Sequence, residues 1–64
     1  MSFSKNLRTL RLRHSVTQTE LAKKLNLSRT AISNYENGKV QPSFETLIKI
    51  SELFQVTIDE LIKK

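Results

Sequence analysis

The stretch "TQTELAKKLNLSRTAISNYENG", from Thr17 to Gly38, contains two helix starts a short distance apart. Thr17 and Glu20 form a Thr-x-x-Glu capping box, in which the threonine hydroxyl accepts a hydrogen bond from the third helical amide and the glutamate reaches back to the cap. Ser28 is a good N-cap for a second helix. Asn26, between them, tolerates the left-handed backbone of a helix end. The pattern therefore predicts two helices joined by a turn of about three residues.

Cap signals and apolar spacing divide the rest of the chain into three more helices. Before the quoted stretch, Phe3, Leu7 and Leu10 recur at helical spacing. After it, Pro42 and Ser43 mark the start of the most apolar helix, which we expect at the centre of the fold. A second Thr-x-x-Glu box near the C-terminus opens a short last helix. The expected helices cover approximately residues 2–13, 18–25, 29–37, 44–54 and 58–62 of a single domain, residues 1–64.

Composition supports an all-α fold and narrows the compartment. The chain has 64 residues, 38% of them hydrophobic, with one Gly and one Pro, which is too little turn chemistry for a β fold. It has no cysteine, so a disulfide scaffold or a cysteine-ligated metal site is excluded. There is no apolar run of the ~18 residues that a membrane span needs, and no signal peptide. We expect a soluble, cytoplasmic protein.

Positive charge is concentrated in the first two thirds of the chain. The net charge is +5. Eight basic and two acidic residues precede Gln41, a balance of +6, and three basic residues against four acidic ones give −1 from Gln41 onward. Such an asymmetry indicates an anionic partner, either nucleic acid or an acidic membrane surface.

The second helix of the quoted pair has an outer side suited to reading DNA bases. Arg29 can bond guanine O6 and N7, Asn34 can bond adenine N6 and N7, and Thr30 can contact a thymine methyl; Ser33 lies beside them. Any helix at a protein surface has a polar outer side, so this composition alone does not decide. Together with the tight turn and the uneven charge, it favours a helix-turn-helix, in which the second helix lies in the major groove.

The sequence resembles the Cro and phage-repressor type of helix-turn-helix regulators, also called the xenobiotic-response-element family. The similarity is carried by "LRTLR", "TQTELAKKLNLSRTAISNYENGK" and "PSFETLIKISELFQVTIDELI", nearly the whole chain. It implies a compact five-helix, lambda-repressor-like domain that binds operator DNA, usually as a symmetric dimer. It also implies a nucleoid-associated protein of a prokaryote or phage. This chain departs from the family at Asn26, where glycine is common, and in its short, weakly basic "KVQP" loop.

The same resemblance assigns roles to individual residues. Arg11 and Glu36 match a pair that ties the first helix to the end of the recognition helix. Base edges are expected to be read by Arg29, Thr30, Ser33 and Asn34. DNA phosphates are expected to be bound by Gln18, Ser28, Asn37, Gly38 and Lys39.

The C-terminal helix has more apolar residues than one short helix can bury in a thin core. We expect a dimer patch there, made of Val56, Ile58, Leu61 and Ile62. A two-fold axis through this patch would set two recognition helices ~34 Å apart, one turn of DNA. The sequence therefore favours a homodimer at least on DNA.

The leading hypothesis is a sequence-specific regulator, expected to be a repressor, that binds a palindromic operator of double-stranded DNA. An adaptor or antitoxin module that keeps the fold is the alternative, although its outer helix side would be more apolar. A membrane binder would need a wide hydrophobic helix face. We expect no enzyme, cofactor, metal or small-molecule ligand, because catalytic constellations are missing and His14 is a lone histidine. The chain is compatible with a complete small repressor or the DNA-binding part of a longer one.

Overall fold

The computed structural model describes residues 3–63. Within this range it has five α-helices and no strand, which confirms the all-α prediction. They are α1 (Phe3–Arg13), α2 (Gln18–Leu25), α3 (Arg29–Glu36), α4 (Phe44–Phe54) and α5 (Ile58–Ile62). The third helix ends one residue earlier than expected, with Asn37 as its C-cap; residue 2, expected in the first helix, lies outside the described range. No helix in residues 3–63 has the length and apolarity to cross a bilayer.

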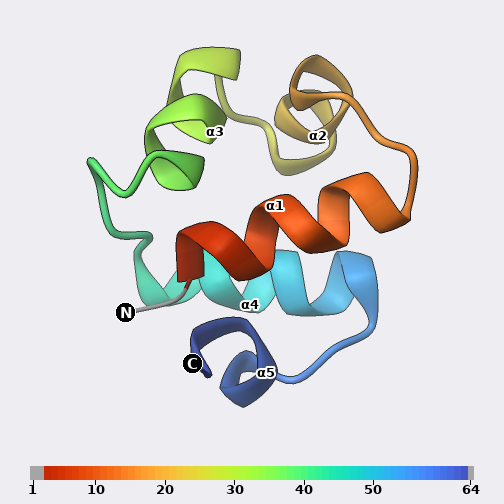
Figure 1. Ribbon diagram of the computed structural model, residues 1–64, viewed down its shortest axis with the longest axis vertical. Coiled ribbons are helices and arrows are strands. Elements are labelled where there is room, and N and C mark those ends of the chain that lie inside the picture. The colour runs from red at the N-terminus through yellow and green to blue at the C-terminus, as the bar shows by residue number, and fades with distance from the viewer. Residues whose placement is uncertain (1–2, 64) are drawn as a thin grey trace.

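Helix α1 crosses the middle of the molecule, with α2 and α3 on one side and α4 and α5 on the other (Figure 1). It contacts α3 and α5 directly, while α4 contacts α2 and α5. Every helix supplies at least one fully buried side chain to one shared core: Phe3, Leu7, Leu21, Ile32, Ile50 and Leu61. Each such side chain stabilises the fold by about 1.5 to 3 kcal/mol relative to its exposed state.

Hydroxyl side chains cap the starts of four helices. Thr17 and Thr57 make full capping boxes, and their partners Glu20 and Glu60 bond back to the cap amides. Ser28 and Ser43 cap α3 and α4 through single hydrogen bonds to the backbone. These four positions are the ones that the sequence indicates, because Ser and Thr accept the otherwise unpaired first-turn amides.

The helix ends are tight left-handed turns, and only one of them uses glycine. Gly38 has a φ of +72°, and Ser15, Asn26 and Gln55 have φ values of 55°, 59° and 54°. At Asn26 the next amide, that of Leu27, bonds back to the carbonyl of Ala22 at 2.8 Å, which closes the turn in six residues. The sequence indicated Asn26 and Gly38 but not Ser15 or Gln55, whose residue types are uncommon in this conformation.

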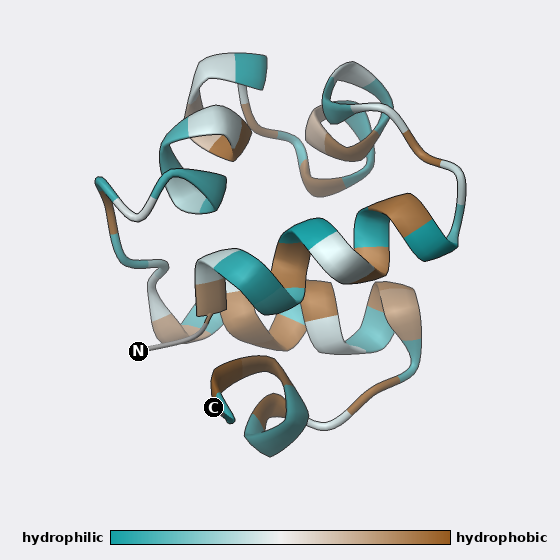
Figure 2. Cartoon of the chain, in the orientation of Figure 1, coloured by the Kyte–Doolittle hydropathy of each residue, from teal (hydrophilic) through white to brown (hydrophobic). Residues whose placement is uncertain are grey.

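The most apolar helix is not buried along its whole length. Figure 2 shows hydrophobic residues through most of α4, yet Phe44 at its start is 67% exposed. Ile50 is fully buried, and Phe44 precedes it by six residues, which places its side chain about 120° around the helix from the buried side. This helix therefore contributes to the core through one side, and its first turn carries an exposed ring.

Candidate nucleic-acid interface

A rigid turn sets α3 against α2. Asn26 adopts φ 59° and ψ 42°, and its own amide bonds to the carbonyl of Lys23 at 3.2 Å. The angle between the helices is filled by Ala22, Leu25 and Ile32, which are at most 3% exposed. Because buried small and apolar side chains fill this angle and backbone bonds close the turn, α3 is held in one orientation.

The four expected base-reading residues lie on one helix, away from its buried residues. Arg29 and Thr30 are exposed, while Ser33 and Asn34 are half-buried. Ile32 and Tyr35 point into the core, where Tyr35 meets the ring of Phe3 edge-on at 5.9 Å.

Asn37, just after α3, extends this polar row by one turn. Its Nδ2 donates to the Ser33 hydroxyl at 3.3 Å, so the Ser33 oxygen already has a partner within the protein. Ser28 is exposed at the other end of α3, and its hydroxyl accepts from the amide of Ala31. Both hydroxyls therefore have structural roles alongside any contact with a ligand.

Beneath this surface, the carboxylate of Glu36 joins three helices. Arg11 of α1 donates to it through Nε at 2.6 Å and Nη2 at 3.1 Å, and Gln18 of α2 donates through Nε2 at 3.1 Å. Arg11 also donates from Nη1 to the carbonyl of Val16 at 3.0 Å. The side chains of Arg11 and Glu36 are only 12% and 4% exposed. The Glu36 hydrogen bond raises the pKa of the Arg11 guanidinium above its ordinary value.

Sequence reasoning proposed the Arg11 and Glu36 pair through the family resemblance but missed the third member, Gln18. No local signal could reveal it, because Gln18 and Glu36 are 18 positions apart and only the helix packing brings them together. The bond uses one of the two N–H groups of the Gln18 amide. The second N–H is left to reach a phosphate, the role expected for this residue.

An open hollow of about 540 Å³ lies where α1, α2 and α3 meet, lined by Arg11, Thr17, Gln18, Thr19 and Arg29. The Thr17 cap engages the amides of Glu20 and Leu21. The amides of Gln18 and Thr19 come before these, at the positive end of the α2 dipole, where the first amides of a helix have no carbonyl partner within the helix. The Arg29 guanidinium and the start of α2 make this hollow suited to an anion such as a phosphate, while the Arg11 guanidinium is already paired with Glu36. Thr19 was not among the expected site residues.

The expected second backbone contact lies at the turn after α3. Asn37, Gly38 and Lys39 are all exposed. The Lys39 amide bonds to the carbonyl of Asn34 at 2.9 Å, which closes the turn through the left-handed Gly38. The start of α1 lies beside it, since a Cβ at Gly38 would be 3.9 Å from the Ser4 hydroxyl oxygen. The turn is thus held against α1 with its polar groups outward.

A helix-turn-helix family model matches residues 7–61 of this chain. The chain belongs to this helix-turn-helix family. The match, together with the relatives below, confirms the resemblance to regulators of the Cro and phage-repressor type.

The HTH-type transcriptional activator BcrR of Enterococcus faecalis is 50% identical over 62 residues, which are 97% of this chain and 30% of that protein. The HTH-type transcriptional regulator ImmR of Bacillus subtilis is 41% identical over 64 residues, 100% of this chain and 50% of ImmR. The chain thus spans half or less of these relatives. Their names agree with the expectation of a regulator and not an enzyme.

The fold is also that of a solved repressor. The P22 c2 repressor, crystallised with a synthetic operator, matches with a TM-score of 0.89 and 30% identity, over 95% of this chain and 92% of that one. This likeness covers all the helices of the helix-turn-helix domain described above, and it confirms the lambda-repressor-like fold class.

The expected dimer patch of this helix-turn-helix domain needs correction. Leu61 is fully buried, so it is not part of any surface patch. Val56 is half-buried and packs against the core. The reason is the hydrophobic staple: residues flanking a capping box turn toward each other and inward. Only Ile58, half-buried, and Ile62, 37% exposed, remain available from the expected set.

Two apolar residues outside the expected patch are exposed. Val40 is 46% exposed and Phe44 is 67% exposed. The link after α4 turns back beneath it, and α5 packs against α4 with the C-terminal end of the chain on the side where α4 begins (Figure 1). We use the name apolar edge for the apolar residues with exposed surface in the loop before α4, at the start of α4 and on α5: Val40, Phe44, Ile58 and Ile62. The six-residue offset of Phe44 from Ile50 was the sequence signal for its exposure.

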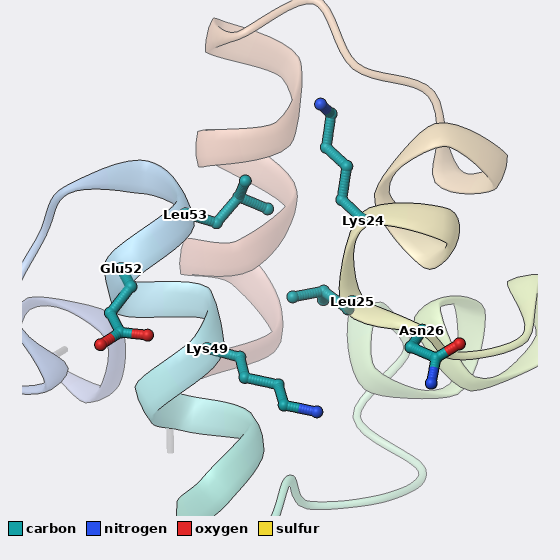
Figure 3. Close-up of a pocket in the computed structure, with 6 residues that line it drawn as sticks. All are labelled: Lys24, Leu25, Asn26, Lys49, Glu52 and Leu53. Carbon is teal, nitrogen blue, oxygen red and sulfur yellow. The ribbon is translucent and has the colours of Figure 1, made fainter.

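A further hollow of about 450 Å³ lies between α2 and α4, lined by Lys24, Leu25, Asn26, Lys49, Glu52 and Leu53 (Figure 3). Lys24 and Lys49 lie on opposite sides of it, and both are exposed. None of its polar side chains is buried, and no group of three metal-binding side chains occurs in the described range. These features fit solvated lysines that add positive charge to this side of the helix-turn-helix domain.

Proposed function

We propose that this chain binds operator DNA in double-stranded form and regulates transcription, with α3 in the major groove. In this proposal Arg29, Thr30, Ser33 and Asn34 read base edges. One phosphate lies in the hollow at the start of α2, and a second lies at the turn after α3, where Lys39 adds its charge. The observation that carries the proposal is the row of polar side chains on α3, placed beside a hollow that is suited to an anion.

The proposal includes a homodimer on a palindromic site. The apolar edge is a surface that a second copy can cover about a two-fold axis, because the same residues then meet from both sides. Two copies paired in this way would place their recognition helices about 34 Å apart, one helical turn of DNA. Bound across a promoter, such a dimer represses by excluding polymerase. The proposal assigns this activity to the nucleoid in the cytoplasm of a prokaryotic cell.

Support from the comparisons comes from what the relatives are. The P22 c2 repressor was crystallised on a synthetic operator, and its domain has the same fold. The adaptor or antitoxin alternative requires a different outer side of α3, with large apolar residues for a protein partner. Arg29 and Thr30 are the exposed residues there, and neither is large and apolar. The face favours DNA.

Selection of bound sites from random duplex DNA tests the proposal. The expected result is an enriched palindrome whose half-sites are about one helical turn apart. An enriched single half-site would keep the DNA function and remove the dimer. Recovery of no preferred sequence would contradict base reading by α3 and favour the adaptor.

A further inference from the structure

The side chain of Asn6 ties α1 to the end of α5. Its Nδ2 lies 2.8 Å from the carbonyl oxygen of Leu61, 2.7 Å from that of Lys63 and 3.3 Å from that of Glu60. An amide NH2 group has two N–H donors, so the two short contacts are full hydrogen bonds and the third shares a donor. These partners are separated from Asn6 by 54 to 57 positions in the sequence.

Helix α5 depends on such contacts because it is very short. It has five residues, and isolated helices of that length do not form in water. Its start is held by the Thr57 and Glu60 capping box, and its middle is anchored by the fully buried Leu61. The last carbonyls of any helix lack partners within the helix. Asn6 supplies those partners, so α5 is tied to the rest of the fold by Leu61 in its middle and by Asn6 at its end, while the capping box acts within its first turn.

The orientation of α5 determines where half of the apolar edge lies. Ile58 and Ile62 are four residues apart, so they share one side of the helix. Leu61 and the preceding Val56 pack against the core near the start and middle of α5. The two short hydrogen bonds from Asn6 add a directional contact at the end of the helix.

We propose that Asn6 is a positioning residue for pairing with a second copy of this chain. By holding the end of α5, it keeps Ile62 at the height and angle at which the apolar edge meets its symmetry mate. This inference rests on the dimer in the proposed function. The hydrogen bonds of the Asn6 side chain go to the end of α5 and not to α2 or α3, and the neighbouring Leu7 is fully buried in the core. Loss of the Asn6 amide therefore loosens α5 and leaves the DNA-reading face in place.

Asn6→Asp is the sharpest variant, because aspartate has the same shape but, when ionised, no donor for the carbonyls. Asn6→Ala removes the group entirely. Thr9→Ala is the matched control, since Thr9 is exposed on the same helix and lines the same small hollow between α1 and α5.

Two quantities are measured for each protein. The first is the exchange rate of the Leu61 and Lys63 amides, by NMR on free protein. The second is the ratio of affinities for a palindromic duplex and for a duplex with one half-site.

The expected result is faster exchange of the α5 amides in both Asn6 variants, with α2 and α3 unchanged. The palindrome-to-half-site ratio falls about tenfold, the half-site affinity stays within about twofold, and Thr9→Ala behaves as wild type. Unchanged α5 exchange would overturn the clamp. Equal losses on both duplexes would reduce Asn6 to a general stability role and overturn positioning. A wild-type ratio of one would overturn the dimer itself, which separates failure of the proposed function from failure of the Asn6 inference.

Discussion

The two sides of α1 differ in charge and in what they leave exposed. On the side of α2 and α3, the exposed surface is polar and basic, and a nearly buried ion pair with Gln18 holds the helices together. On the side of α4 and α5, the charge balance is slightly negative, and the exposed residues include Phe44 and Ile62. In the function proposed above, the first side binds DNA and the second pairs with another copy of the chain.

The largest expected effect comes from breaking the ion pair that joins α1 to α3. Glu36→Gln removes the charge that pairs with Arg11, and the guanidinium is then left nearly buried without a counter-charge. Breaking such a pair costs about 3 to 5 kcal/mol in the free energy of unfolding, a large share of the stability of a small domain. Urea unfolding at neutral pH measures it. Glu52→Gln, at an exposed site, is the control and stays within about 0.5 kcal/mol of wild type.

The next effect separates base reading from general attraction. Arg29→Ala removes a guanidinium at the exposed start of α3. It is expected to cost about 1 to 3 kcal/mol of binding and to relax preference at one base pair, a guanine. Titration against single-base operator variants measures this, with Arg13→Ala as an exposed arginine control on α1. A uniform loss over all variants would show that Arg29 contacts only phosphate.

The apolar side is tested at its most exposed member. Phe44→Asn removes a ring that is 67% exposed, so the free energy of unfolding changes by no more than about 0.5 kcal/mol. Affinity for a palindrome falls about tenfold relative to a half-site, because the ring no longer meets its symmetry mate. Analytical ultracentrifugation of the protein with each duplex gives the number of protein chains bound per duplex. If the variant keeps the palindrome-to-half-site ratio of the wild type, Phe44 is not part of the dimer contact.

A smaller effect concerns the turn after α3. Lys39→Ala is expected to weaken binding to all DNA sequences alike and to lower the slope of log affinity against log salt by about one unit, because one fewer phosphate is neutralised. Affinities at several salt concentrations give the slope. Lys49→Ala, on α4, is the matched control. If the slope stays as in wild type, Lys39 does not bind phosphate.

The smallest expected effect is the pH dependence of stability that comes from the two capping boxes, one at the start of α2 and one at the start of α5. Hydrogen bonds from Thr17 and Thr57 lower the pKa of Glu20 and Glu60 below the ordinary 4.5. Each box therefore contributes its full stability above that value and loses it as the pH falls through the lower folded pKa. Unfolding by urea between pH 6 and pH 3 should show stability decreasing below about pH 4.5. The double variant Glu20→Gln and Glu60→Gln should decrease less steeply; identical slopes would contradict the role of the boxes.

Local signals in the sequence were enough for most of the fold. Thr17, Ser28 and Thr57 mark helix starts because a hydroxyl cap acts on amides three residues away. The C-terminal end of α4 was harder to predict. Gln55 adopts the left-handed conformation there, whereas glycine and asparagine are the residue types that usually mark such a helix end.

The parts that sequence missed depend on contacts between distant segments. The Gln18 bond to Glu36 and the Asn6 clamp on α5 join residues that no window of sequence relates. Burial of Leu61 was misjudged for a related reason: the residue was counted as surplus apolar surface, although its place in the second staple turns it inward. The row on α3, by contrast, follows from helical spacing alone.

Amide chemical-shift mapping with a duplex that carries the selected site tests the central claim most directly. The account predicts that the amides of residues 28–39 and of Gln18 and Thr19 shift strongly. On a duplex with one half-site, the amides of α4 beyond its first turn should stay unchanged. Shifts concentrated on α4 and α5, with residues 28–37 undisturbed, would contradict the assignment of α3 to DNA.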